Sequence, residues 1–153
     1  MGREKKRRIA ANGRWLPVPL DFLRSRACAE LSPLSAKLLL DLLALLGPNC
    51  SGNGDLSISP KALAARGWSS RASLQEAVRE LLDHGLLVIT RQGSRTECRL
   101  FAVSLFPLDC DQSKLDVGRG CYTHFEHTRG DPRLATPPSE SDPARWRRAR
   151  KSK

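Results

Sequence analysis

The chain has 153 residues, about one domain with a modest core, which excludes architectures that need roughly 250 residues. Lysine and arginine number 26 against 16 acidic residues, and the resulting charge of +10 favours a polyanionic partner. The excess lies at the two ends, because residues 1–14 hold six basic residues and one acidic residue, and residues 144–153 hold six basic residues and no acidic ones. Residues 15–105 hold 10 basic and 8 acidic residues, so a protein that is cationic throughout is also excluded.

The cysteines and the apolar segments indicate a location in the cytoplasm. The five cysteines form no C-x-x-C pair and their number is odd, so a disulfide framework is not expected. The most apolar stretch, residues 34–46, is shorter than the roughly 20 residues that span a bilayer, and Lys37 and Asp41 interrupt it. We therefore expect no membrane partner and a cytoplasmic protein.

The first segments in chain order are a basic arm and an extended entry. Residues 1–14 lack any apolar period, which predicts a disordered basic arm. The apolar stretch that begins at Trp15 contains two prolines, so it predicts an extended segment that leads into a short helix over residues 21–28. Trp15, and Trp68 further along the chain, are expected to pack in the core or in a turn.

The clearest helix follows. Ser32 is a good N-cap, Pro33 suits the first helical position, and Gly47 with the proline after it stops the helix after residue 46. Its leucines cover almost the whole circumference, which predicts a helix that is covered on several sides. They suit either a central core helix or half of the seam of a homodimer.

A short strand and two further helices come next. Residues 56–58 predict a strand after a glycine-rich loop, and Ser59 caps a short second helix. Ser69 or Ser70 caps a third helix that runs to about residue 84. The apolar residues of this third helix recur at the spacing of one buried face, so its other face is predicted to meet solvent or a ligand.

A hairpin and a tail complete the chain. Residues 86–91 and 98–105 are rich in β-formers and predict a hairpin with a polar tip, whose second strand alternates and so has one preferred face. Residues 106–153 contain five prolines and few large apolar groups, which predicts a flexible tail with a basic C-terminus. A short basic helix from residue 142 onward would end it.

The order of these elements, together with three motifs, resembles that of bacterial winged helix-turn-helix proteins. The motifs are Leu56-Ser57-Ile58-Ser59-Pro60-Lys61-Ala62-Leu63-Ala64, Ser69-Ser70-Arg71-Ala72-Ser73-Leu74 and Leu81-Leu82-Asp83-His84-Gly85-Leu86-Leu87. Residues 31–105 are similar to the DNA-binding modules of bacterial regulators and of plasmid and phage replication proteins. The resemblance implies an α+β fold, mainly α, with a three-helix core and a β-hairpin wing over residues 15–105. Trp68, after Gly67, departs from the small apolar residue that is common in this turn.

The resemblance implies sequence-specific binding of double-stranded DNA by a nucleoid-associated transcriptional regulator, with the third helix in the major groove. We expect Arg71 to bond a guanine and Gln75 an adenine, while Glu76 reads a cytosine or neutralises Arg79. Arg95 at the hairpin tip would contact a minor groove or a phosphate. The candidate DNA-binding residues are Ser69, Ser70, Arg71, Ser73, Gln75, Arg79, Arg91, Arg95 and Arg99.

Three alternatives stay open at this point. A replication or maintenance protein of a plasmid or phage would use the same module. A winged helix can instead be a protein interaction module, with the central leucines and Trp68 as the partner surface. The basic ends alone could bind RNA or the ribosome, with steeply salt-dependent affinity.

Metal binding and catalysis find little support in the sequence. Cys110, Cys121, His124 and His127 have ligand chemistry, but their C-x10-C-x2-H-x2-H spacing matches no zinc finger, so no metal is expected. No phosphate-binding loop, G-x-S-x-G or H-E-x-x-H motif occurs. We therefore expect no cofactor and no enzymatic activity.

Overall fold

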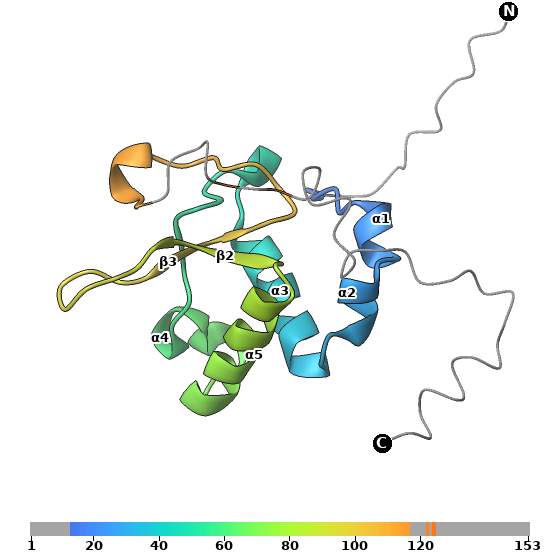
Figure 1. Cartoon of the computed structure of the whole chain (residues 1–153), viewed down its shortest axis with the longest axis horizontal. Helices are drawn as coiled ribbons and strands as arrows, with labels where there is room; N and C mark the ends of the chain where they lie inside the picture. Colours follow the sequence, from blue (N-terminus) through green and yellow to red (C-terminus); the bar gives the residue numbers. More distant parts are fainter. Residues whose placement is uncertain (1–12, 117–121, 123, 125–153) are drawn as a thin grey trace, which may run out of the picture.

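The computed structural model describes residues 13–116, 122 and 124, and within them five α-helices and three antiparallel strands form an α+β fold (Figure 1). The helices are α1 (Leu20–Leu23), α2 (Arg26–Glu30), α3 (Pro33–Leu45), α4 (Pro60–Leu63) and α5 (Arg71–Asp83). The strands are β1 (Leu56–Ser57), β2 (Leu87–Arg91) and β3 (Leu100–Val103), and three 3₁₀ turns are η1 (Pro48–Cys50), η2 (Ala64–Arg66) and η3 (Gln112–Lys114). In this part of the chain, none of the helices is long and apolar enough to cross a bilayer.

Serine caps begin the helices that the sequence predicted. The hydroxyl of Ser32 accepts the amide of the third residue after it at 3.3 Å, and Ser59 does the same at 3.1 Å. Ser70, rather than Ser69, caps α5 in the same way. The expected single helix over residues 21–28 is two short helices, because Ser25 between them is buried and caps α2.

β3 is the central strand of the sheet, with β1 and β2 on either side of it. All four of its residues are buried, so the predicted one-sided alternation is wrong: both faces of a central strand are covered here. The strand begins at Leu100 rather than residue 98, and its register against β2 shifts between Ile89 and Arg91. Thr90, at this bulge, is buried and donates its hydroxyl to the carbonyl of Gly54 at 2.7 Å.

The core lies between α3, α5 and the sheet. Leu38 and Leu42 of α3 and Leu81 of α5 are fully buried, and each such side chain contributes about 2 kcal/mol of hydrophobic stabilisation. α3 is predicted to be covered on several sides, but within the described chain it is buried along one face only. Its remaining large exposed side chains are those of Leu34, Leu40 and Leu45.

Trp15 is 70% exposed, so its predicted place in the core is wrong. Pro17 and Pro19 keep this entry segment extended, and successive side chains of an extended chain point in opposite directions. Leu16 and Val18 pack against the core, and Trp15, one residue out of step with them, faces away from it.

The chain turns back after β3 and runs beside the sheet (Figure 1), so the predicted disorder from residue 106 is wrong for its first part. Phe106 is buried, the Asp109 amide donates to the Asn53 carbonyl at 3.0 Å, and the Asp116 amide donates to the Thr90 carbonyl at 2.9 Å. The basic arm up to residue 12 and the predicted helix from residue 142 lie outside the described residues.

Asn53 joins the loop before β1 to the end of β3. It is fully buried, and its side-chain nitrogen donates to the carbonyls of Val103, Phe106 and Pro107 at 2.9–3.1 Å. Its side-chain oxygen accepts the Val103 amide at 2.8 Å. The Tyr122 hydroxyl donates to two of the same carbonyls, and burial raises the pKa of this phenol. One asparagine therefore fixes the end of the central strand.

We expect Asn53→Ala to lower the free energy of unfolding by about 3 kcal/mol, because buried backbone groups that lose their partners cost about 1–3 kcal/mol each. Urea denaturation would measure this loss. Gln112→Ala is the matched control, since Gln112 is exposed and its loss should change stability by less than about 0.5 kcal/mol. Equal stability of the two variants would contradict the role assigned to Asn53.

Candidate nucleic-acid interface

α5 begins after a tight turn that follows α4. Gly67 ends the turn η2 with φ 85° and ψ 15°, a left-handed conformation that glycine adopts without strain. Ser69 and Ser70 are exposed at the start of α5. The amides and the positive dipole end of a helix N-terminus attract phosphate, so this end of α5 suits a polyanion.

Asp41 of α3 anchors this turn. Its carboxylate accepts the indole N–H of Trp68 at 2.7 Å and pairs with Lys37 at 2.5 Å and Arg66 at 3.4 Å. The Lys37 ammonium also lies 4.9 Å from the centre of the Trp68 ring. Partial burial raises the pKa of Asp41, but the hydrogen bonds from Lys37 and Trp68 outweigh it and hold the pKa below its usual value. Trp68 is buried, which confirms its predicted packing in the turn and accounts for its presence there.

Glu80 ties the middle of α5 to the start of α3. Its carboxylate accepts the Ser32 amide, the Ser32 hydroxyl and the hydroxyl of the fully buried Ser35, each at 2.6 Å. Desolvation raises the pKa of Glu80, but these hydrogen bonds outweigh it and hold the pKa below its usual value. α5 is thus fixed both before its first residue and along its length.

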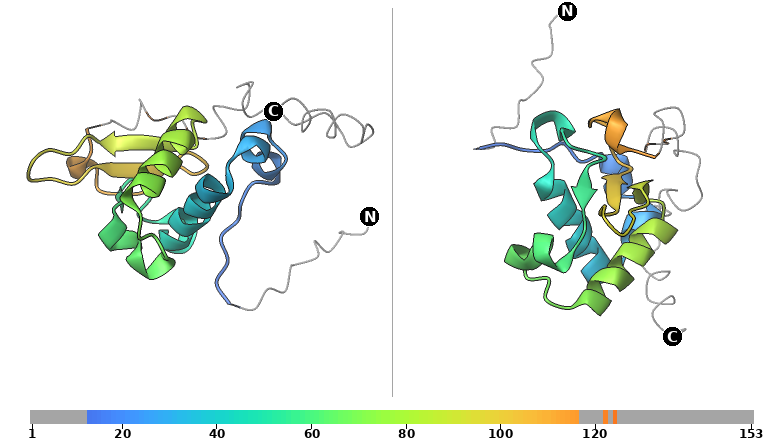
Figure 2. Two further views of the ribbon diagram at one scale, coloured as in Figure 1. Left: turned by 90° about the horizontal axis from the view of Figure 1, so that it is seen from below. Right: turned by 90° about the vertical axis from the view of Figure 1, so that its left-hand side faces the viewer.

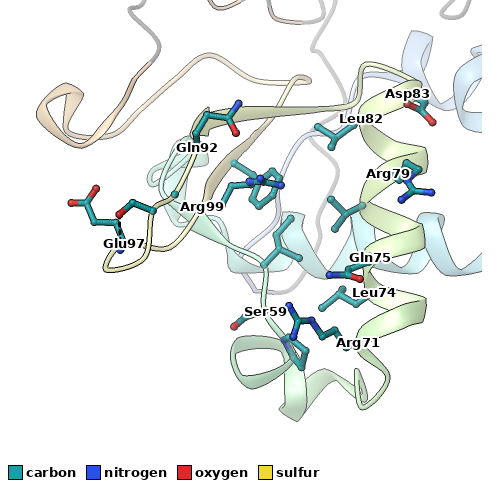
Figure 3. Close-up of a pocket in the computed structure, with 16 residues that line it drawn as sticks. Ser59, Arg71, Leu74, Gln75, Arg79, Leu82, Asp83, Gln92, Glu97 and Arg99 are labelled. Atoms are coloured by element: carbon teal, nitrogen blue, oxygen red, sulfur yellow. Dashed lines mark hydrogen bonds between the residues drawn. The ribbon is translucent and has the colours of Figure 1, made fainter.

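An open groove of about 890 Å³ runs between α5, the start of α4 and the β2–β3 hairpin. Figure 2 shows the hairpin reaching beyond α5, and Figure 3 shows Gln75 and Leu82 pointing from α5 into the groove while Arg99 projects from the hairpin. The groove is lined by Ile58, Ser59, Pro60, Arg71, Leu74, Gln75, Val78, Arg79, Leu82, Asp83, Gln92, Gly93, Ser94, Glu97, Arg99 and Phe101.

The groove brings together four of the nine predicted contact residues: Arg71, Gln75, Arg79 and Arg99. They come from two elements that are distant in the sequence, since Arg99 belongs to the hairpin and the others to α5. Ser73 is half-buried, and its hydroxyl donates to that of Ser70 at 3.1 Å. These two serines therefore shape the start of the helix.

Arg95 stands at the exposed tip of the hairpin. The Ser94 amide donates to the Glu97 carbonyl at 2.9 Å, and the Ser94 hydroxyl accepts the amides of Thr96 and Glu97 at 3.3 and 3.2 Å. Gly93, before this turn, has a φ of 64°, and a Cβ there would lie only 2.7 Å from the Arg99 amide. These contacts give the tip a defined shape and hold Arg95 outward.

Arg91 is the last residue of β2 and bonds across the hairpin. Its Nε and Nη2 donate to the Cys98 carbonyl at 3.1 and 3.0 Å, so the guanidinium bridges the base of the hairpin. It does not line the groove. In this position Arg91 supports the hairpin. Arg99, on the opposite segment of the hairpin, faces α5 instead.

Sequence reasoning missed several polar residues of the groove, among them Ser59, Gln92 and Glu97. The sequence identifies Ser59 as a helix cap only. Gln92 and Glu97 begin and end the polar tip of the hairpin, and a choice based on positive charge alone passed over them. The signal that would have found them is their position at the neck of a hairpin next to α5.

The residues with metal-ligand chemistry are only partly described. Cys110 and His124 are described, whereas Cys121 and His127 lie outside the described residues. In the described part of the chain, no three histidine, cysteine or acidic side chains gather as a metal site would require.

Comparison with protein-family models, with curated proteins and with solved structures found no match to this chain. The function of the groove is therefore inferred from its residues and geometry.

We expect the free energy of unfolding of Glu80→Gln to fall less steeply with decreasing pH than that of the wild type. The folded-state pKa of Glu80 lies below its ordinary value of 4.5, so the unfolded chain binds more protons between these two values and stability rises with pH there. The stabilisation is complete above the unfolded-state pKa and is lost as the pH falls through the folded-state pKa. Urea unfolding from about pH 6 to about pH 3 should show a shallower decline for the variant.

Glu76→Gln is the matched control for this measurement, because Glu76 is exposed on the same helix. It should keep the wild-type dependence on pH. A Glu80→Gln profile parallel to that of the wild type would show that the serine contacts do not stabilise the charged carboxylate.

Proposed function

We propose that this chain is a winged helix-turn-helix protein that binds double-stranded DNA sequence-specifically. In this proposal α4 and α5 are the helix-turn-helix, and the β2–β3 hairpin is the wing. α5 enters the major groove with its N-terminal residues towards the base edges, while the hairpin contacts the flanking backbone.

One observation carries the proposal: arginines from α5 and from the hairpin line the same open groove. Arg71 lies at the first position of α5, and Arg99 projects from the hairpin into the same groove. Arginine forms paired hydrogen bonds with guanine and with phosphate, so two such residues on separate elements can contact a base and fix the register on the backbone. Arg95 extends the basic surface to the hairpin tip.

The biological role that we favour is transcriptional regulation. A replication or maintenance protein of a plasmid or phage is the alternative, since it would use the same module. The basic residues at both ends of the chain would add sequence-independent affinity through counterion release. Dimerisation on a palindromic site would extend the proposal to a homodimer.

A protein interaction module is a second candidate, favoured by the exposed Leu34, Leu40 and Leu45 of α3. Trp68 does not contribute to such a surface, because it is buried beside Asp41. A salt titration separates the candidates. Duplex binding whose logarithm falls linearly with the logarithm of salt supports DNA recognition, and no binding even near about 50 mM salt supports the interaction module.

We expect selection from a random duplex pool to enrich one sequence with the wild-type protein. Arg71→Ala should weaken binding to that sequence about tenfold and relax the choice of one base, because a paired contact to guanine contributes about 1–3 kcal/mol. Arg95→Ala should weaken all duplexes about equally, because the tip contacts backbone or minor groove.

Arg24→Ala is the matched control, since Arg24 is exposed on the α1 side of the molecule and does not line the groove. It should select the same sequence with unchanged affinity. Failure of the wild type to enrich any sequence would overturn sequence-specific recognition, and equal selection by all three variants would overturn the residue assignments.

A further inference from the structure

The floor of the groove is apolar, whereas the surface of a paired duplex is mainly polar. Ile58, Val78 and Leu82 are only partly buried, and all three line the groove. Val78 and Leu82 are one helical turn apart on α5, so they form a continuous apolar strip between the basic walls. A paired duplex would place mainly its charged backbone against this strip, because its bases are stacked inside.

We propose that this groove binds an unpaired segment of a DNA strand, with a phosphate at Arg99 and bases on the apolar floor. The inference rests on the proposed DNA-binding function and narrows its substrate to duplexes that carry an unpaired stretch. An unpaired strand exposes the apolar faces of its bases beside its phosphates, which is the combination that this groove matches.

The dimensions and polar groups of the groove fit this occupant. An open groove of about 890 Å³ has room for a few nucleotides. Gln75 on α5 and Gln92 on the hairpin carry amides that can donate to and accept from base edges. The lining carries the positive charges of Arg71, Arg79 and Arg99 and the negative charges of Asp83 and Glu97, so phosphate is favoured where the arginines lie.

Fluorescence anisotropy with the full chain tests the inference. Three labelled probes share one duplex of about 20 base pairs: a blunt form, a form with a single-stranded overhang of about six thymidines, and a form whose overhang is abasic. We expect the thymidine overhang to bind about fivefold tighter than the blunt duplex, and the abasic overhang, which keeps its phosphates but has no bases, to lose most of this advantage.

Val78→Thr tests the floor, because threonine keeps the shape of valine and replaces a methyl group with a hydroxyl. It should remove most of the overhang advantage, measured as the ratio of overhang affinity to blunt-duplex affinity of the same variant. Gln92→Ala, at an exposed position, supplies a second variant that should lower the advantage if Val78→Thr does not fold. Leu40→Thr, an exposed apolar residue outside the groove, is the matched control and should keep the full advantage.

The outcomes distinguish this inference from the proposed function. Equal binding of the blunt and overhang probes, or of the abasic and thymidine overhangs, overturns the inference while duplex recognition stands. Binding of the thymidine overhang without binding of the blunt duplex overturns duplex recognition and supports the inference. A uridine RNA overhang that binds more than about fivefold tighter than its DNA counterpart overturns the assignment to DNA.

Discussion

The position of α5 depends on the hydrogen bonds that Ser32 and Ser35 donate to the Glu80 carboxylate. Two helices packed through leucines alone have several arrangements of similar energy, because apolar contacts have no direction. A partly buried carboxylate with three donors has one good geometry, since each lost donor would leave part of its negative charge without a hydrogen bond. Asp41 imposes the same kind of constraint on the turn before α5, through Trp68 and two cations.

The fixed position of α5 determines which charged side chains line the groove. The body of the domain carries nearly as many acidic as basic residues, so its attraction for a polyanion is local. Glu80 is withdrawn into the contact with α3, and Asp41 is paired within the turn, which leaves the arginines to dominate the wall near the start of α5. Glu80 and Asp41 thus hold the scaffold, while Arg71, Arg79 and Arg99 line the groove together with Asp83 and Glu97.

Local rules predicted the helices of this chain, and contacts between distant residues were beyond their reach. Ser32, Ser59 and Ser70 cap helices as expected, because a cap involves only the next three residues. The role of Asn53 was not predictable, since its partners lie about 50 residues further on and its neighbours are typical of a loop. For the candidate site, charge and helix periodicity found Arg71 and Gln75, but they did not separate Arg99, which faces α5, from Arg91, which braces the hairpin.

The buried side chain of Asn53 has a consequence for synthesis of the protein. The ribosome makes this residue and α5 well before it makes Val103, Phe106 and Pro107, which supply the matching carbonyls. Until those residues leave the exit tunnel, the side-chain amide of Asn53 can hydrogen-bond only to water, and the sheet lacks its middle strand. The nascent chain therefore completes its core late. A pause in translation just after β2 would keep the core incomplete.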